Sequence, residues 1–282
     1  MLSDSKVRIG MVNFINTAPL YDIWQRTVNR PEWKVIEAAP SVLNRMLYEN
    51  DLDMGLVSSQ EYAAHPQDYL ILDDISISAS GPVGSVFLFS RCDPGQLADR
   101  IVLLSGQSHT SVSLVKIILE KFYHVEPVYQ VGSALKAKEN KEIQAVLAIG
   151  DEALLLAQSG TYSHKIDLSK IWHEKTSLPF VFAIWAIREK FCRENPGVVE
   201  DIHRELLRCR SEGRKDLKNI SKRVAPRVSM DAEACYEYLL GIEHDLGPDK
   251  QKGLIRFIEY LIERGEGAAD SLPLKFFPLV EG

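Results

Sequence analysis

Short apolar runs alternate with helix-like stretches along most of this 282-residue chain, and this alternation constrains its fold more than any other feature. The runs Val7–Val12 and Ile101–Leu104 are typical of buried strands, and each is followed by a polar loop. After the second loop, apolar residues recur with the spacing of one helix face, at Val115, Ile118, Leu119 and Phe122. Strands that alternate with helices in this way favour an α/β fold with mostly parallel sheets.

A break in this pattern and a long apolar run divide the chain into two halves. The break is Arg91–Gly95, and the apolar run is Leu178–Ile187, which ends in charged residues. We interpret the segments near 86–91 and 182–188 as crossings between two lobes. The prediction is a discontinuous first lobe of residues 1–90 plus 188–282 and a second lobe of residues 91–187.

Polar loops that are suited to ligand contacts occur in both halves of the chain. They would converge if the two lobes faced each other across a cleft. That hinged arrangement is the one found in periplasmic binding proteins, which close around small ligands. The sequence therefore predicts an α/β, two-lobed fold of the periplasmic binding protein type II kind, with the ligand cleft between the lobes.

Two loops of the predicted first lobe place polar side chains at the carboxyl ends of strands, where parallel sheets commonly bind ligands. Asn16 and Thr17 follow the first strand, and Ser58 and Ser59 follow the strand that starts near Asp53. All four are candidate ligand contacts. Asn, Ser and Thr are also common helix N-caps, so simple capping stays open for each of them.

A second group of candidates lies in the predicted second lobe. The loop 105–111 leads into a helix, whose free N–H groups and positive dipole end favour carboxylate or phosphate. It lacks the Gly-Lys-Ser/Thr ending of a P-loop. Asp151, at the start of another helix, has the residue type of either a catalytic base or an N-cap. The loop candidates, each of which also fits a capping role, are Ser108, His109, Thr110 and Ser111.

Composition narrows the class of protein. The formal charge of −6 argues against a nucleic-acid partner, whose binding surface would be basic. No run approaches the roughly 18 apolar residues of a membrane span, and the residues before Val7 contain no apolar signal core. The four cysteines are far apart, without a Cys-x-x-Cys pair or clustered histidines, so we expect reduced thiols and no metal site. We therefore expect a cytoplasmic protein without a membrane partner.

Five stretches together resemble the chorismate dehydratase family, and they occur in order along roughly the whole chain. The family makes 3-[(1-carboxyvinyl)oxy]benzoate at the start of the futalosine route to menaquinone. Each stretch alone is a weak signal. The stretches are Phe14–Tyr21, Gly81–Val86, Ser108–Val112, Ile149–Ala153 and Leu178–Trp185.

The resemblance implies a cofactor-free lyase that removes water from chorismate. Carried over by motif, Asn16 and Ser85 would lie at the reacting ring as catalytic residues, with the enolpyruvyl carboxylate of the substrate as the base. Asn16 would hydrogen-bond the departing hydroxyl or a carboxylate, and Ser85 would position the substrate. Phe180 and Trp185 could wall the ring side of the cleft, although aromatic residues in an apolar run are more often core.

Two other functions stay open at this point. The sister enzyme of the same route, which makes dihydroxynaphthoate, is similar in fold, but its Ser-Pro-Cys-Pro-Asn opening is replaced here by Asn-Phe-Ile-Asn-Thr-Ala-Pro. A binding protein for a small carboxylate, without catalysis, is the other alternative. The sequence also leaves open whether the chain forms a homodimer.

Overall fold

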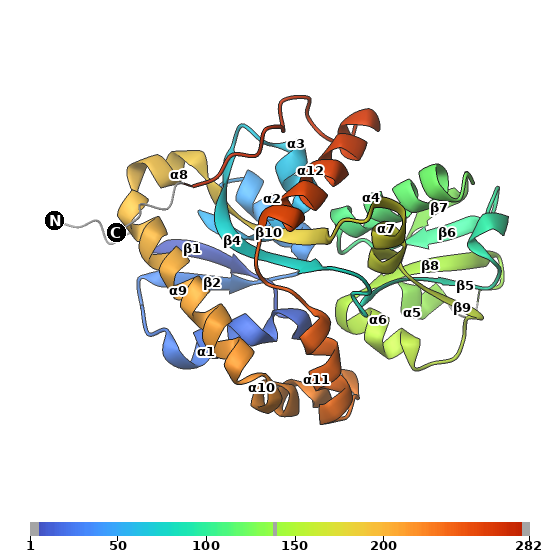
Figure 1. Ribbon diagram of the computed structural model, residues 1–282, viewed down its shortest axis with the longest axis horizontal. Coiled ribbons are helices and arrows are strands. Elements are labelled where there is room, and N and C mark those ends of the chain that lie inside the picture. The colour runs from blue at the N-terminus through green and yellow to red at the C-terminus, as the bar shows by residue number, and fades with distance from the viewer. Residues whose placement is uncertain (1–5, 138–139, 278–282) are drawn as a thin grey trace.

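Two five-stranded sheets form the centres of two lobes in this computed structural model, which describes residues 6–137 and 140–277 (Figure 1). The first sheet has the strand order β2-β1-β3-β10-β4 and the second has the order β7-β6-β8-β5-β9. The strands of the first sheet are β1 (Val7–Met11), β2 (Trp33–Glu37), β3 (Met54–Ser58), β4 (Tyr69–Ala79) and β10 (Phe180–Arg188). Those of the second sheet are β5 (Val86–Ser90), β6 (Ile101–Leu104), β7 (Val128–Val131), β8 (Ile143–Ile149) and β9 (His164–Asp167).

Helices cover both sheets (Figure 1). The helical elements of the first lobe before the crossing are η1 (Ile15–Thr17), α1 (Ala18–Thr27), α2 (Pro40–Tyr48) and α3 (Ser59–Ala64). Those between the two crossings are η2 (Pro94–Gln96), α4 (His109–Ile117), the π-helical turn η3 (Ile118–Phe122), α5 (Ala134–Ala137), α6 (Gly150–Ala157) and α7 (Leu168–Thr176). The C-terminal ones are α8 (Glu189–Glu194), α9 (Pro196–Lys215), α10 (Leu217–Val224), η4 (Ala225–Val228), α11 (Ala232–Gly241) and α12 (Pro248–Glu263).

The two-lobed α/β fold agrees with the sequence prediction, but each sheet is mixed rather than mostly parallel. β1 pairs in parallel with β2 and β3, and β6 pairs in parallel with β7 and β8. β10 is antiparallel to β3 and β4, and β5 is antiparallel to β8 and β9. The antiparallel pairs arise because β5 and β10 are the strands that enter a sheet directly after the chain has crossed from the other one.

The crossings between the sheets lie earlier than the sequence analysis expected. Val86–Ser90 is already a strand of the second sheet, and Phe180–Arg188 is already a strand of the first. The connecting segments are therefore 80–85 and 177–179, instead of the regions near 86–91 and 182–188, and the lobe boundaries move with them. A fully buried strand and an apolar crossing have the same sequence pattern, which explains the difference.

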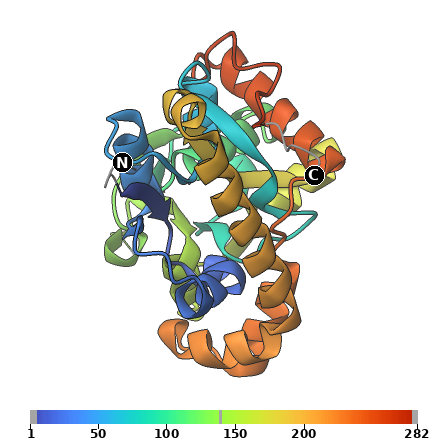
Figure 2. The same cartoon turned by 90° about the vertical axis from the view of Figure 1, so that its left-hand side faces the viewer.

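The C-terminal part of the chain returns along the first lobe (Figure 2), and near its described end Phe276 bridges Ile71 of β4. The long helix α9 packs closely on α1, since a Cβ at Gly213 would lie 1.4 Å from the Pro19 carbonyl oxygen. After α11, Glu243 pairs with Ser78 of β4 through an isolated antiparallel bridge. This path places α11 and residues 242–245 against the loops that follow β1 and β4, where Tyr238 bonds Ser85 and His244 bonds the Asn16 backbone. Among the described residues, none of the helices has the length and apolar character to cross a bilayer.

Candidate active site

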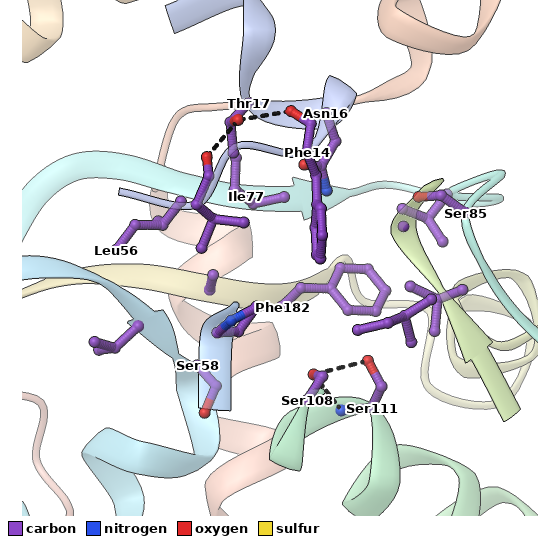
Figure 3. A pocket seen from close by; sticks show the side chains of 18 residues that line it. Phe14, Asn16, Thr17, Leu56, Ser58, Ile77, Ser85, Ser108, Ser111 and Phe182 are labelled. Atoms are coloured by element: carbon purple, nitrogen blue, oxygen red, sulfur yellow. Dashed lines mark hydrogen bonds between the residues drawn. The ribbon is translucent and has the colours of Figure 1, made fainter. Parts of the chain in front are cut away.

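A cavity lies between the two sheets, at the loops that the sequence analysis selected (Figure 3). The space within it is about 580 Å³, which includes the part of its mouth that is open to solvent. Both lobes contribute: the loop after β1, the ends of β3 and β10, the segment 80–85, and the first turns of α4 and α6. Its polar side chains are Asn16, Thr17, Ser58, Ser85, Ser108 and Ser111, all predicted from the sequence.

The rest of the cavity wall is apolar, and none of its described lining residues carries a charge. The ring of Phe14 from the first lobe and the ring of Phe182 from β10 project into the space (Figure 3). Gly150 makes room for Phe14, since a Cβ there would lie 3.0 Å from the ring, and the positive φ of 55° also favours glycine. The geometry suits a ligand with an apolar ring and peripheral hydrogen-bonding groups.

Asn16 presents an unpaired acceptor at the cavity. Its Oδ1 atom is buried and has no hydrogen-bond partner among the described residues. Its backbone oxygen accepts a hydrogen bond of 2.8 Å from Nε2 of His244, which lies behind the loop. Burial lowers the pKa of His244 to about 4, so the imidazole is neutral near pH 7. Since a buried polar atom is normally paired, Asn16 Oδ1 is placed to accept from a ligand.

The Ser58 hydroxyl accepts two hydrogen bonds from the protein, which leaves only its proton for another partner. The Ser58 backbone N–H donates to Oδ1 of Asn44 at 3.1 Å, which fixes the orientation of the Asn44 amide. Asn44 Nδ2 then donates to Ser58 Oγ at 2.8 Å, and the Glu61 N–H donates to the same oxygen at 3.2 Å. Both lone pairs of the hydroxyl are used. No described protein group is bonded to accept its proton, which is therefore free for a further acceptor.

The first turn of α4 contributes a similar hydroxyl. Ser108 caps the helix, accepting from the Ser111 N–H at 3.3 Å, and its own hydroxyl donates to Ser111 Oγ at 3.1 Å (Figure 3). Ser111 thus accepts from Ser108 and retains its proton. Thr17 behaves differently, because its hydroxyl lies 2.7 Å from the backbone oxygens of both Val12 and Phe14 and stabilises the loop itself.

Three further predicted residues lie outside the cavity lining. Ser59 is buried and donates to the Val181 oxygen at 2.8 Å, which ties α3 to β10. Thr110 is buried as well, and its hydroxyl accepts from the Gln60 N–H at 3.0 Å, a contact between the lobes. His109 is exposed on the first turn of α4. The structure therefore separates each of these residues from the cavity-lining serine next to it.

Asp151 also bridges the lobes instead of facing the cavity. Its Oδ1 accepts from the Ile15 N–H at 3.1 Å, and its Oδ2 lies 3.4 Å from the guanidinium of Arg227. Arg227 in turn donates to the Asn13 backbone oxygen at 2.5 Å. Burial raises the pKa of Asp151, while the Ile15 hydrogen bond and the charge of Arg227 oppose the shift. These contacts join the two lobes beside the cavity. We call the residues around the cavity that bond to the protein its rim: Asn13, Ser59, Thr110, Asp151 and Arg227.

The aromatic residue of β10 that lines the cavity lies two positions after the predicted Phe180. Phe180 and Trp185 are fully buried in the core, where Phe180 packs edge-on against Trp172 and Phe257. Phe182, two residues after Phe180, is the one that lines the cavity, with its ring centroid 4.6 Å from that of Phe180. In a regular strand, residues two apart share a face, but a register shift between Val181 and Ala183 interrupts the β10–β4 ladder at Phe182. Such a bulge is invisible in a continuous apolar run.

Three residues that support the site were missed by the sequence analysis: Asn44, Tyr238 and His244. They hydrogen-bond Ser58, Ser85 and the Asn16 backbone, respectively. Two of them come from the C-terminal region, far along the chain from their partners, and no local pattern marks them. In the described part of the chain, no group of three or more His, Cys, Asp or Glu residues is arranged to hold a metal ion.

Comparison with known proteins assigns the chain to a family. The profile of a family described as "Menaquinone biosynthesis" matches residues 7–263, which is most of the chain. This chain belongs to the menaquinone biosynthesis family. A chorismate dehydratase from Thermus thermophilus is 30% identical to this family member over 273 residues, covering 90% of this chain and 94% of the relative. A chorismate dehydratase from Campylobacter jejuni is 29% identical over 188 residues, covering 64% and 67%.

Solved structures similar to this menaquinone biosynthesis family member share its fold. A structural-genomics protein from Archaeoglobus fulgidus superposes with a TM-score of 0.69 at 18% identity, covering 94% of this chain and 99% of its own. The periplasmic aliphatic sulphonate-binding protein of Escherichia coli does so with a TM-score of 0.68 at 13% identity, covering 99% and 95%. These likenesses confirm the periplasmic binding protein-like fold.

Proposed function

We propose that this protein dehydrates chorismate to 3-[(1-carboxyvinyl)oxy]benzoate, the first step of the futalosine route to menaquinone. It is a carbon–oxygen lyase of the same kind as its relatives named chorismate dehydratase. The observation that carries the proposal beyond the family is the uncharged cavity, in which hydroxyl donors and one amide surround apolar walls. Chorismate has matching groups: a six-membered ring, two carboxylates and a hydroxyl.

Neutral groups bind both carboxylates in this proposal. The Ser58 and Ser111 hydroxyls each have a proton without a described protein acceptor, and α4 and α6 begin at the cavity. A helix N-terminus stabilises an anion through its free N–H groups and its dipole. The ring lies between Phe14 and Phe182. A cation at the site would also make the substrate carboxylate a weaker base. Neutral donors bind the dianion without that effect.

The base that takes the C3 proton is the enolpyruvyl carboxylate of the substrate, as the family resemblance implies. This is supported by the lining residues, none of which among those described is a Glu, Asp, His or Lys. Asp151 is occupied by Ile15 and Arg227 at the rim. Holding the substrate carboxylate against its own C3–H makes the transfer intramolecular, and such positioning can supply about 7 kcal/mol of the barrier or more.

Asn16 and Ser85 act on the departing hydroxyl. Asn16 Oδ1 accepts the O–H of the C4 hydroxyl, which fixes the C4–O bond, and Ser85 donates a hydrogen bond to the same oxygen. As the C3–H bond breaks, its electron pair forms the new ring double bond and the C4–O bond breaks. The departing hydroxyl takes up the C3 proton from the enolpyruvyl carboxyl group and leaves as water, which restores the carboxylate, and the ring becomes aromatic. The reaction takes place in the cytoplasm, a location supported by four cysteines that are all free thiols.

The test of this proposal is to mix the purified protein with chorismate and follow the aromatic protons of the product by NMR. We expect one aromatic product with a 1,3-substitution pattern, formed in proportion to enzyme concentration. A heat-denatured sample is the control for spontaneous aromatisation. Saturable binding of chorismate without turnover would contradict the proposal and favour a binding protein.

A further inference from the structure

The backbone of Ser85 is held rigidly, so that only its hydroxyl can still rotate. Its backbone oxygen accepts from the Gly150 N–H at 2.8 Å. The two preceding N–H groups, of Val83 and Gly84, donate to the carboxylate of Asp167 at 3.2 and 2.7 Å. Ser85 lies in the connecting segment between the lobes and lines the cavity (Figure 3). The remaining question is where its proton points.

Tyr238 of α11 answers that question. Its hydroxyl donates to Ser85 Oγ at 2.9 Å. The tyrosine ring packs on Gly84, where a Cβ would lie 3.2 Å from ring atom Cδ2 and where φ is +72°, so the glycine leaves space for the ring. Burial raises the pKa of Tyr238, so the phenol stays protonated and remains a donor near neutral pH. Tyr238 itself is not among the residues that line the cavity.

We propose that Tyr238 is a positioning residue for the dehydration. Its phenol donates a hydrogen bond to Ser85 Oγ, and this bond directs the Ser85 proton into the cavity, toward the departing C4 oxygen. A serine hydroxyl has one proton to donate, and among the described residues none is bonded to accept the one on Ser85. Without Tyr238 the hydroxyl can turn its oxygen, and not its proton, toward the substrate. The inference rests on the proposed function.

A neighbouring tyrosine on the same helix provides a matched control. Tyr236 is half-buried, and its ring contacts the ammonium of Lys218, 5.5 Å from the ring centroid, instead of the cavity loops. Tyr236→Phe and Tyr238→Phe make the same chemical change two residues apart. Any loss that follows from removing a hydroxyl from α11 in general would appear in both variants.

The test compares steady-state chorismate turnover of the wild type, Tyr238→Phe and Tyr236→Phe, together with thermal unfolding of each. We expect Tyr238→Phe to lower kcat about three- to tenfold, the factor that one neutral hydrogen bond brings, with KM within twofold of wild type. Tyr236→Phe should match wild type. Unchanged kcat in Tyr238→Phe, or a loss shared equally by kcat, KM and unfolding temperature, would overturn the inference.

A double variant sharpens the test. If Tyr238 acts through Ser85, adding Tyr238→Phe to Ser85→Ala should cause no further loss, whereas independent effects would multiply. The single variants decide the question alone if Ser85→Ala is too slow to measure. The two proposals remain distinguishable: a wild-type protein without turnover overturns the proposed function and this inference with it, while an active wild type with an equally active Tyr238→Phe overturns only the inference.

Discussion

The cavity and its rim are built from residues that are neighbours in sequence but differ in their hydrogen-bond partners. Ser58 and Ser111 line the cavity and retain a proton for a ligand, whereas Ser59 and Thr110, one position away, bond to protein backbone. Thr110 and Ser111 are successive residues of α4, about 100° apart around its axis. Ser58 is the last residue of β3, and Ser59 is the first of α3, so only one of each pair faces the cavity. Asp151 belongs with the rim. A polar residue in a loop beside a ligand cavity can therefore bond to the protein instead of to the ligand.

The largest effect should follow from removing the unpaired amide of the cavity. Asn16→Ala is expected to lower kcat about 100-fold or more, the usual loss for a polar group that acts on the reacting atoms. Stability should change little, because Asn16 Oδ1 has no described protein partner to lose. The control is Asn13→Ala, on the rim, where the side chain bonds Arg227 and Glu37. Comparable kcat values for the two variants would remove Asn16 from the site.

Lowering the pH should reduce the free energy of unfolding through His244, which bonds the Asn16 backbone at the cavity. Its folded-state pKa of about 4 lies below the ordinary 6.5, so the unfolded chain binds the proton more readily. The stability from the neutral imidazole is complete above about pH 6.5 and is lost as the pH falls toward 4, by about 3 kcal/mol for a shift of this size. The neighbouring charges are those of Arg210, Arg214 and Asp245.

Chemical denaturation across this pH range measures the effect. We expect the unfolding free energy of wild type to fall more steeply between pH 6.5 and 4 than that of His244→Asn. Equal slopes for the two proteins would show that His244 is not the group responsible.

Much of the fold is predictable because the strands and helices alternate locally. Ile101–Leu104 matches β6 residue for residue, and the helix after it begins at the expected loop. The crossings could not be located, since β5 and β10 are buried strands whose apolar runs carry no sign of which sheet they join. The direction of each strand relative to its neighbours could not be predicted either, because it depends on which sheet the strand joins.

The site is predictable only where its residues lie in a loop after a strand. Three residues meet that condition: Asn16, Ser58 and Ser111. Ser85 is found only through its family motif. Their supporting residues do not: Tyr238 is 153 positions from Ser85, and His244 is 228 positions from Asn16. Contacts over such separations arise from the return path of the chain, which no local pattern records.

A smaller effect should separate Ser58 from Ser59. Ser58→Ala removes a hydroxyl donor to a substrate carboxylate, so we expect kcat/KM to fall about tenfold, mostly through KM, since a hydrogen bond to a charged group is worth about 1.5 kcal/mol or more. Ser59→Ala loses one bond to the Val181 oxygen and should affect only stability. Steady-state kinetics with thermal melts of both variants measure this difference. Equal kcat/KM values would contradict the division between cavity and rim.

The central claim, that the substrate and not the protein supplies the base, is tested most directly by the kcat of Asp151→Asn at saturating chorismate. The asparagine oxygen can still accept from the Ile15 N–H, and only the partly exposed pair with Arg227 is lost, which is worth little. We predict kcat within twofold of wild type and a KM raised less than about threefold. A fall in kcat of about 100-fold or more, as expected on removing a general base, would contradict the account and place the catalytic base at Asp151.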